Sequence, residues 1–277
     1  MIYIAAQGRQ IPALGFGTYK LKGSAGRDAI ANALETGYRH IDTAQFYDNE
    51  ADVGAAVAAS GVARADIFLT TKIWPDNAAE GKLQFSFDES LRKLKTDYAD
   101  LLLIHWPSSP APFREQMKAL QSVKDAGKAK LIGVSNFTVA QTKEVLETIG
   151  APVAANQVEY HPYLSQNPLL DYMRAHGLFL TAYCPVAQGK VTKDPVIGRI
   201  ANAHGKTPSQ VALRWLVQQD NVAAIPKAGS EAHIRENFDI FDFALSDQEM
   251  KQISALARPD GRIVNPQGIA PKWDKAA

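Results

Sequence analysis

Four residues in the first half of the chain belong to types that together can deliver a proton to a carbonyl oxygen. Asp42, Lys72 and His105 each follow a short apolar segment directly, and Tyr47 comes five residues after Asp42. A tyrosine holds its proton at neutral pH, because its reference pKa is about 10, and can donate it to a developing alkoxide. A buried Lys72 beside Tyr47 would stabilise the resulting phenolate and lower the tyrosine pKa, while Asp42 would keep the lysine charged. A neutral His105 could direct the carbonyl through a hydrogen bond.

The elements that must position these residues alternate regularly along the chain. Short apolar segments predict eight buried strands, at 14–17, 38–41, 67–71, 101–104, 131–134, 153–158, 179–182 and 222–225. Amphipathic segments between them predict helices, at 26–36, 50–60, 82–94, 113–126, 139–149, 168–176 and 208–218. Strands alternating with helices predict a parallel sheet, and eight such units without a linker predict a closed α/β barrel of the (β/α)8 TIM type. We expect one domain over residues 1–277, with a short N-terminal β-hairpin lid formed by the first dozen residues.

An open dinucleotide-binding sheet is the alternative architecture. It would need a Gly-x-Gly-x-x-Gly turn between a strand and a helix, whereas Gly15, Gly17 and Gly23 have the wrong spacing. The glycine pattern therefore favours the closed barrel.

Barrels of this kind carry their active sites at the carboxyl ends of the strands. Polar residues stand at the ends of the later predicted strands as well: Ser135, Asn136, Gln157, Tyr183 and Lys227. A lone aspartate after a strand is usually a helix cap, and a lone lysine is usually a solvated charge. A carboxylate, an ammonium, a phenol and an imidazole around one barrel mouth are not explained by stability alone, so they predict a catalytic site there.

Composition limits the partners of the protein. The 277 residues include 30 basic and 29 acidic ones, a formal net charge of +1, so no global field favours nucleic acid or anionic lipid. Cys184 is the only cysteine, which excludes an internal disulfide and fits a reducing compartment, so we expect a cytoplasmic protein. The segment from Met1 to Pro12 lacks the features of a secretory signal, and no apolar run has the length of a membrane span. The six histidines lack metal-binding spacing, so no metal is expected.

Several longer motifs carry a resemblance to a known family. They are GYRHIDTAQFYDNE at 37–50, LLLIHWP at 101–107, KLIGVSNF at 130–137 and IPK at 225–227. From Pro12 to Trp273 the sequence resembles the aldo-keto reductases, and it is most similar to their bacterial 2,5-diketo-D-gluconic acid and methylglyoxal reductases, including the ending RIVNPQGIAPKW at 262–273. The resemblance implies a monomeric oxidoreductase in which hydride passes from NADPH or NADH to a carbonyl. It also implies that Asp42, Tyr47, Lys72 and His105 form the catalytic tetrad, with Tyr47 as proton donor.

The resemblance further implies which residues hold the cofactor. Ser135, Asn136 and Gln157 would bind the nicotinamide carboxamide, and Tyr183 would stack on the ring. The full set implied to contact cofactor is Gly17, Thr18, Tyr19, Asp42, Ser135, Asn136, Gln157, Tyr183, Pro185, Val186, Ile225, Lys227, Ala228, Ser230, His233, Glu236 and Asn237.

Two positions depart from the family pattern where relatives bind the 2′-phosphate of NADPH. Ala228 replaces a hydroxyl residue and His233 replaces an arginine, which removes a hydrogen-bond partner and a permanent cation. Lys227 and Ser230 remain, so we expect NADPH use with appreciable NADH use. A further departure places Cys184 directly after Tyr183; a nucleophilic role is the alternative to a small buried residue, but no paired histidine motif supports it.

The residues expected to contact substrate are Tyr19, Phe46, Tyr47, Trp74, His105 and Trp106. The large aromatic rings among them favour small or flat carbonyl compounds, although plain core packing would also explain such rings. By resemblance the substrates are α-dicarbonyls such as methylglyoxal, keto-sugar acids, β-keto esters and reactive aldehydes. Two other functions stay open: a Schiff-base lyase that uses Lys72, and a non-catalytic nucleotide-binding barrel.

Overall fold

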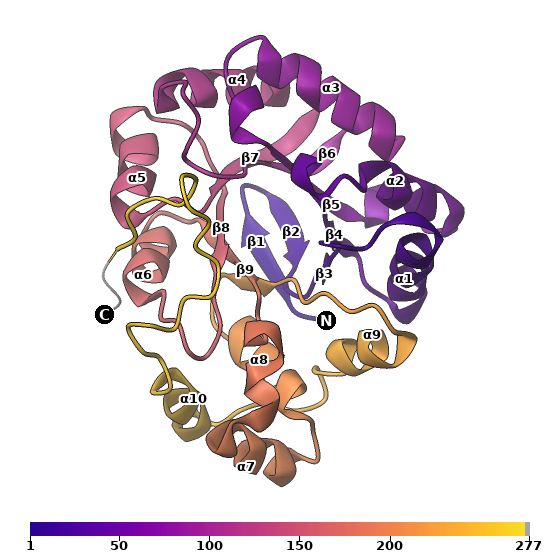
Figure 1. Ribbon diagram of the computed structural model, residues 1–277, viewed down its shortest axis with the longest axis vertical. Coiled ribbons are helices and arrows are strands. Elements are labelled where there is room, and N and C mark those ends of the chain that lie inside the picture. The colour runs from indigo at the N-terminus through magenta and orange to yellow at the C-terminus, as the bar shows by residue number, and fades with distance from the viewer. Residues whose placement is uncertain (275–277) are drawn as a thin grey trace.

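The computed structural model describes residues 1–274, and the last three residues of the expected single domain, 275–277, lie outside the described part. Eight parallel strands form one sheet in the order β10, β9, β8, β7, β6, β5, β4, β3 (Figure 1). They are β3 (Phe16–Gly17), β4 (His40–Asp42), β5 (Phe68–Ile73), β6 (Ala99–Ile104), β7 (Ala129–Ser135), β8 (Ala155–Glu159), β9 (Phe179–Tyr183) and β10 (Val222–Ala224). Every strand predicted from the apolar segments is present, with ends that differ by a few residues.

The two edges of this sheet meet and close it. Leu14, just before β3, forms a parallel bridge with Ala224 at the end of β10. Gly15 donates its backbone N–H to the Ala224 carbonyl at 2.8 Å, and Ala224 donates to the Ala13 carbonyl at 2.7 Å. The predicted (β/α)8 barrel is therefore confirmed. All residues of β5 and β6 are buried, as expected for strands covered on both faces.

The helices form an outer layer around the sheet (Figure 1). They are α1 (Gly23–Thr36), α2 (Glu50–Ala59), α3 (Lys82–Leu94), α4 (Phe113–Asp125), α5 (Val139–Lys143), α6 (Asn167–Ala175), α7 (Pro195–His204), α8 (Pro208–Val217), α9 (Glu231–Phe238) and α10 (Asp247–Ser254). The seven predicted helices are present, and α5 continues as a π-helical segment, Glu144–Thr148.

Three helices, α7, α9 and α10, were not among those predicted. Each starts after a residue whose side chain accepts a backbone N–H of the first turn: Asp194 for α7, Ser230 for α9 and Ser246 for α10. Such capping side chains accept hydrogen bonds from the backbone N–H groups of the first helical turn, which have no partner within the helix. Residues of these types before a helix are a signal that the sequence alone contains.

The N-terminal hairpin consists of β1 (Tyr3–Ala6) and β2 (Arg9–Pro12), joined by a turn at Gln7 and Gly8. Both turn residues have positive φ, 46° and 76°. The guanidinium of Arg9 lies 3.7 Å from the carboxylate of Asp100, near the start of β6. The predicted hairpin is confirmed, and because the chain runs from β2 directly into β3 it lies across the barrel at the amino ends of the strands (Figure 1).

Within residues 1–274, no helix combines the length and the apolar character needed to cross a bilayer. The same residues contain no cluster of three or more His, Cys, Asp or Glu side chains placed to hold a metal ion.

Candidate active site

Lys72 lies at the centre of a hydrogen-bonded cluster at the carboxyl end of the barrel. It projects from β5, beside Asp42 at the end of β4 and Tyr47 in the 3-10 turn Gln45–Tyr47 that follows. Its ammonium donates to Asp42 Oδ1 at 2.5 Å, to the Thr43 carbonyl at 3.0 Å and to Tyr47 Oη at 3.2 Å. These three bonds use all three hydrogens of the ammonium. The structure therefore brings together three of the four residues that the sequence assigned to proton delivery.

Burial shifts the pKa of both proton-carrying groups in this cluster. Removal from water lowers the pKa of Lys72, and the charge of Asp42 opposes that shift. Removal from water also raises the pKa of Tyr47 well above 10, with the Asp42 charge adding to the effect. The expectation that Lys72 would lower the tyrosine pKa is wrong for this state, because burial of the phenol dominates. Tyr47 therefore holds its proton firmly at neutral pH.

His105 follows β6 and packs its ring edge against the ring of Tyr47, with 5.8 Å between ring centroids. Burial and the nearby Lys72 ammonium lower the pKa of His105 well below 6.5, so the imidazole is neutral at neutral pH. Its Nδ1 is buried and has no hydrogen-bond partner among residues 1–274. A neutral imidazole in this position can direct a carbonyl oxygen towards Tyr47 without competing as an acid.

A second polar cluster lies on the neighbouring strand ends and joins the first through Gln157. The Gln157 amide donates to Asp42 Oδ2 at 2.7 Å, so both carboxylate oxygens of Asp42 are hydrogen-bonded. Ser135 Oγ donates to the Gln157 carbonyl at 2.8 Å. Tyr183 at the end of β9 donates its hydroxyl to Asn136 Oδ1 at 2.7 Å, and Asn136 adopts a left-handed backbone, φ 64°. All four residues that the resemblance assigned to the nicotinamide thus lie beside the Asp42–Lys72 pair.

This second cluster fits a nicotinamide carboxamide. Gln157 Oε1 accepts no hydrogen bond from residues 1–274, and Asn136 Oδ1 accepts only one, so both can accept from an amide NH2. The Ser135 hydroxyl can turn from the Gln157 carbonyl to donate to the carboxamide oxygen. The ring of Tyr183 is half-buried and offers a flat apolar face.

The end of β3 and the loop after it place three more of the predicted cofactor residues near Asp42 and Tyr47. Thr18 donates both its backbone N–H and its hydroxyl to the Asp42 carbonyl, at 3.0 and 2.9 Å. A side chain on Gly17 would put its Cβ 2.8 Å from the Ile225 carbonyl, so only glycine fits at this contact between the first and last strands. Tyr19 extends the loop over Tyr47, with 5.0 Å between ring centroids.

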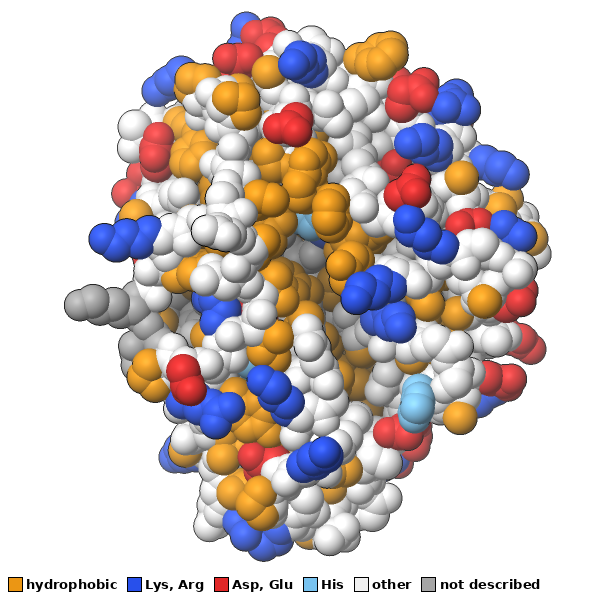
Figure 2. Space-filling view, in the orientation of Figure 1, with side chains coloured by type: hydrophobic (Ala, Val, Ile, Leu, Met, Phe, Trp, Pro, Cys, Tyr) orange, Lys and Arg blue, Asp and Glu red, His pale blue; other side chains and the backbone are white. Residues whose placement is uncertain are grey.

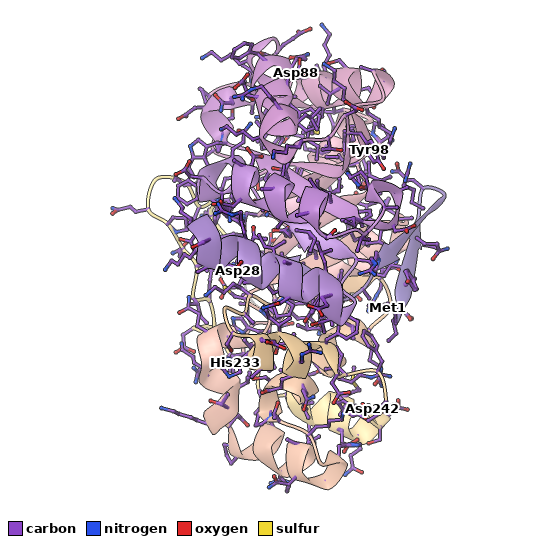
Figure 3. The ribbon with its side chains drawn as sticks, turned by 90° about the vertical axis from the view of Figure 1, so that its right-hand side faces the viewer. Met1, Asp28, Asp88, Tyr98, His233 and Asp242 are labelled. Atoms are coloured by element: carbon purple, nitrogen blue, oxygen red, sulfur yellow. The ribbon has the colours of Figure 1, made fainter. Side chains whose placement is uncertain are left out.

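The residues assigned to the adenosine end form a separate group around the start of α9. Lys227 is exposed and Ala228 is buried. Ser230 Oγ lies 3.0 Å from Nδ1 of His233, which stands on the outer surface (Figure 3). Among the other residues of this group, Glu236 accepts from the hydroxyl of Thr207 at 2.7 Å, and Asn237 is buried. Pro185 and Val186 lie apart from α9 in the chain, directly after β9.

Aromatic side chains surround Tyr47. Figure 2 shows a hollow near the centre of one face of the molecule, bordered by hydrophobic side chains. Phe46 stacks on Trp74, with 4.4 Å between ring centroids, and the Trp74 ring stands edge-on to His105 at 5.5 Å. Tyr19 and Phe46 are 47% and 53% exposed, which excludes plain core packing for these two rings. Trp106 is buried beside His105.

The sequence interpretation missed two contributors near these aromatic side chains. Trp273, from the C-terminal tail, lies against Trp106 with 6.2 Å between ring centroids. Asn49 is buried and holds the Tyr19 loop, because its amide donates to the carbonyls of Thr18 and Leu21, each at 2.8 Å. The sequence signal for Trp273 was its place at the end of the 262–273 motif, to which no role had been assigned.

Cys184 does not have the environment of a nucleophile. It is partly buried, and burial raises the pKa of its thiol to about 11. A thiol with so high a pKa stays protonated at neutral pH, so the nucleophilic alternative is not supported.

Comparison with known proteins identifies the family. The family model described as the aldo/keto reductase family matches residues 13–258. Methylglyoxal reductase DkgB of Escherichia coli O157:H7 is 43% identical over 267 residues, covering 95% of this chain and 99% of that protein. Glyoxal reductase of Bacillus subtilis strain 168 is 40% identical, covering 95% of each. A crystal structure of a protein assigned as a 2,5-diketo-D-gluconic acid reductase B superposes with a TM-score of 0.96 at 52% identity, covering 98% of this chain and 97% of that one. The matched length and identity show that this chain belongs to the aldo/keto reductase family.

Proposed function

We propose that the protein reduces small aldehydes and ketones to alcohols with NADPH, and also with NADH, using Tyr47 as the proton donor. The observation that carries this proposal is the three-way hydrogen bonding of the buried Lys72 ammonium to Asp42, Thr43 and Tyr47. That arrangement keeps one acid next to one buried cation, which is what protonation of a nascent alkoxide requires.

The reaction divides between the cofactor and the chain. When bound, the nicotinamide supplies a hydride to the carbonyl carbon. His105 Nε2 donates a hydrogen bond to the carbonyl oxygen, and the aromatic rim excludes water around it. As negative charge grows on that oxygen, Tyr47 Oη transfers its proton to it, and the Lys72 ammonium at 3.2 Å stabilises the tyrosinate that remains. Asp42 holds Lys72 in place and offsets the cost of its burial.

Carboxamide recognition would fall to Ser135, Asn136 and Gln157, with Tyr183 against the ring. The exposed group around α9 supports a mixed cofactor preference. Lys227 supplies one point charge, whereas Ala228 offers no hydroxyl and His233 no permanent cation for a 2′-phosphate.

The substrate class follows from the rim and from the relatives. Phe46 and Trp74 form a flat aromatic wall that suits small or planar carbonyl compounds. The relatives are a methylglyoxal reductase, a glyoxal reductase and a protein assigned to 2,5-diketo-D-gluconate reduction, so α-dicarbonyls and keto-sugar acids are the proposed substrates. We further propose that the enzyme acts as a cytoplasmic monomer.

The Schiff-base alternative is less well supported. A lysine that attacks a carbonyl needs a free amine. The nitrogen of Lys72 instead has its hydrogens directed at three acceptors, one of them a carboxylate at 2.5 Å.

The test follows the loss of absorbance at 340 nm with methylglyoxal and each cofactor, for the wild type and for Tyr47→Phe. We expect kcat to fall by roughly 10² to 10⁴ in the variant, the usual contribution of a general acid, with cofactor affinity unchanged. Tyr172→Phe is the matched control, because it removes a hydroxyl that bonds Glu147 on the outer surface. A Tyr47→Phe variant that turns over like the control would exclude Tyr47 as the donor, and a wild type that binds cofactor but reduces no carbonyl in a broad panel would point to a binding protein.

A further inference from the structure

The C-terminal tail, residues 258–274, crosses the carboxyl end of the barrel over β8 (Figure 1). The first residues of the tail pack closely against the backbone at Tyr163. The Arg258 N–H donates to the Tyr163 carbonyl at 3.2 Å, and a Cβ on Gly261 would lie 1.7 Å from the same oxygen. Further on, Asp274 accepts the N–H of Val139 at 2.8 Å, where α5 begins. The tail is therefore docked at both of its ends.

Between these ends the tail is held by one buried carboxylate. Glu159, the last residue of β8, is fully buried. Its Oε1 accepts the backbone N–H of Ile263 at 2.6 Å, and its Oε2 accepts that of Val264 at 2.8 Å. Arg262, the preceding tail residue, places Nη1 3.9 Å from Oε2. Two consecutive backbone donors on the two oxygens of one carboxylate fix the register of the tail, because a shift by one residue would lose one donor.

A histidine completes the hydrogen bonding of this carboxylate. His161 is fully buried, its Nδ1 accepts the backbone N–H of Tyr163 at 3.3 Å, and its Nε2 lies 2.9 Å from Glu159 Oε1. Because Nδ1 accepts, the proton sits on Nε2 and is donated to Glu159. The negative charge is thus met by three N–H donors and one nearby guanidinium, which makes its burial tolerable.

The docked tail carries an aromatic ring to the mouth of the site. Trp273 lies over the guanidinium of Arg262 at 3.6 Å and donates its indole N–H to Asn265 Oδ1 at 2.9 Å. Its ring contacts Trp106, which in turn stacks beside His105 at 6.4 Å between ring centroids. Glu159 forms no hydrogen bond with the tetrad among the described residues, but it holds the tail and so determines the position of Trp273 near His105.

We infer that Glu159 is a positioning residue that determines which carbonyl substrates the enzyme prefers, by fixing the tail and hence Trp273. This inference rests on the proposed reductase function. A large substrate that extends from His105 past Trp106 contacts Trp273, whereas a three-carbon dicarbonyl does not extend that far. Loss of the Glu159 contacts therefore weakens binding of large substrates and leaves turnover of small ones intact.

The experiment compares Glu159→Gln with the wild type in two independent measurements. Glutamine keeps the volume but presents an NH2 to one of the two tail N–H groups. Amide hydrogen exchange in peptides covering 258–273 is expected to become roughly tenfold faster, in line with one lost hydrogen bond to a charged group. The ratio of kcat/KM for ethyl benzoylformate to that for methylglyoxal is expected to fall roughly tenfold, through KM rather than kcat.

Glu249→Gln is the matched control, because Glu249 also accepts from a histidine, His204 at 2.8 Å, and from a backbone N–H, that of Ser246 at 2.7 Å, at the start of α10. It should change neither measurement. In a Trp273→Ala background, Glu159→Gln should alter the substrate ratio less than about twofold, because the ring through which it acts is gone.

If hydrogen exchange in the tail is unchanged in Glu159→Gln, Glu159 does not hold the tail. If the change in substrate preference persists in the Trp273→Ala background, Glu159 does not act through Trp273. If the wild type reduces no carbonyl, the proposed function fails, while hydrogen exchange still decides whether Glu159 holds the tail. Should Glu159→Gln not fold, Glu159→Asp keeps the charge and withdraws it by one methylene group, and the same outcomes apply to it.

Discussion

Asp42→Asn removes the charge that faces Lys72 while keeping the size of the side chain. Both residues are buried, with 1% of Asp42 and none of Lys72 exposed, and their charged atoms are 2.5 Å apart. Burial already lowers the pKa of Lys72, and Asp42 is the main influence that opposes it. Removing one partner of such a pair typically costs about 3–5 kcal/mol. We therefore expect a loss of this size from a total free energy of unfolding that is about 5–15 kcal/mol for ordinary domains.

The loss should depend on pH with a definite sign. In Asp42→Asn the folded-state pKa of Lys72 falls further below its unfolded value of about 10.4. Between these two values the unfolded chain binds a proton that the folded protein does not, so stability rises with pH, by up to about 1.4 kcal/mol per unit. The pKa of Lys72 is lowered less in the wild type, where Asp42 opposes the effect of burial, so the wild type gains this stability only at higher pH. The variant should therefore differ from the wild type less at pH 9 than at pH 7.

A second substitution tests the cause. Adding Lys72→Met to Asp42→Asn removes the unpaired charge, and apolar replacement of a buried pair is often neutral or stabilising. The double variant should unfold at a higher urea concentration than Asp42→Asn alone, as measured by far-UV circular dichroism. If Asp42→Asn costs less than about 1 kcal/mol at both pH values, or if Lys72→Met destabilises it further, Lys72 is not a buried ammonium that depends on Asp42.

Three further outcomes follow from the same structure. The pH profile of kcat/KM should show no acidic limb near 6.5 that depends on His105, because its lowered pKa keeps the ring neutral there; a limb near 6.5 that His105→Gln removes would contradict this. Ala228→Thr combined with His233→Arg should raise the preference for NADPH over NADH at least about tenfold, since a guanidinium pairs with a phosphate in bidentate fashion; an unchanged kcat/KM ratio would place the 2′-phosphate elsewhere. In thermal unfolding, Gly54→Ala should lower the free energy of unfolding, because the added Cβ would lie 2.5 Å from a backbone oxygen. Gly198→Ala, inside α7 with open space around it, should raise the free energy of unfolding by about 0.5–1 kcal/mol.

The strands and most helices could be predicted because their signals are local. The segment 67–71 is a run of apolar and β-branched residues, and β5 covers Phe68–Ile73. The segment 82–94 has helical periodicity, and α3 has the same bounds. The helices that were missed, such as α10, carry a local signal too: Ser246 and Glu249 form a capping box at its start.

The geometry of the site depended on information that no local pattern contains. Asp42, Lys72 and His105 could be placed together because the ends of parallel strands meet. The contact of Trp273 with Trp106 joins residues far apart in the chain, and it depends on how the tail docks on Glu159. The sign of the Tyr47 pKa shift depends on the balance between burial and charge, which only the packed structure fixes.

The contact of Leu14 with Ala224 has a consequence for synthesis of the chain. The first barrel strand leaves the ribosome long before its last neighbour, so β3 cannot complete its backbone hydrogen bonds until β10 has been made. Joining segments so distant in sequence carries the largest loop-closure entropy of any strand pairing in the sheet. A nascent chain that stops before Val222 therefore carries an open sheet edge on either side, and such edges are the surfaces through which unfinished β structures aggregate.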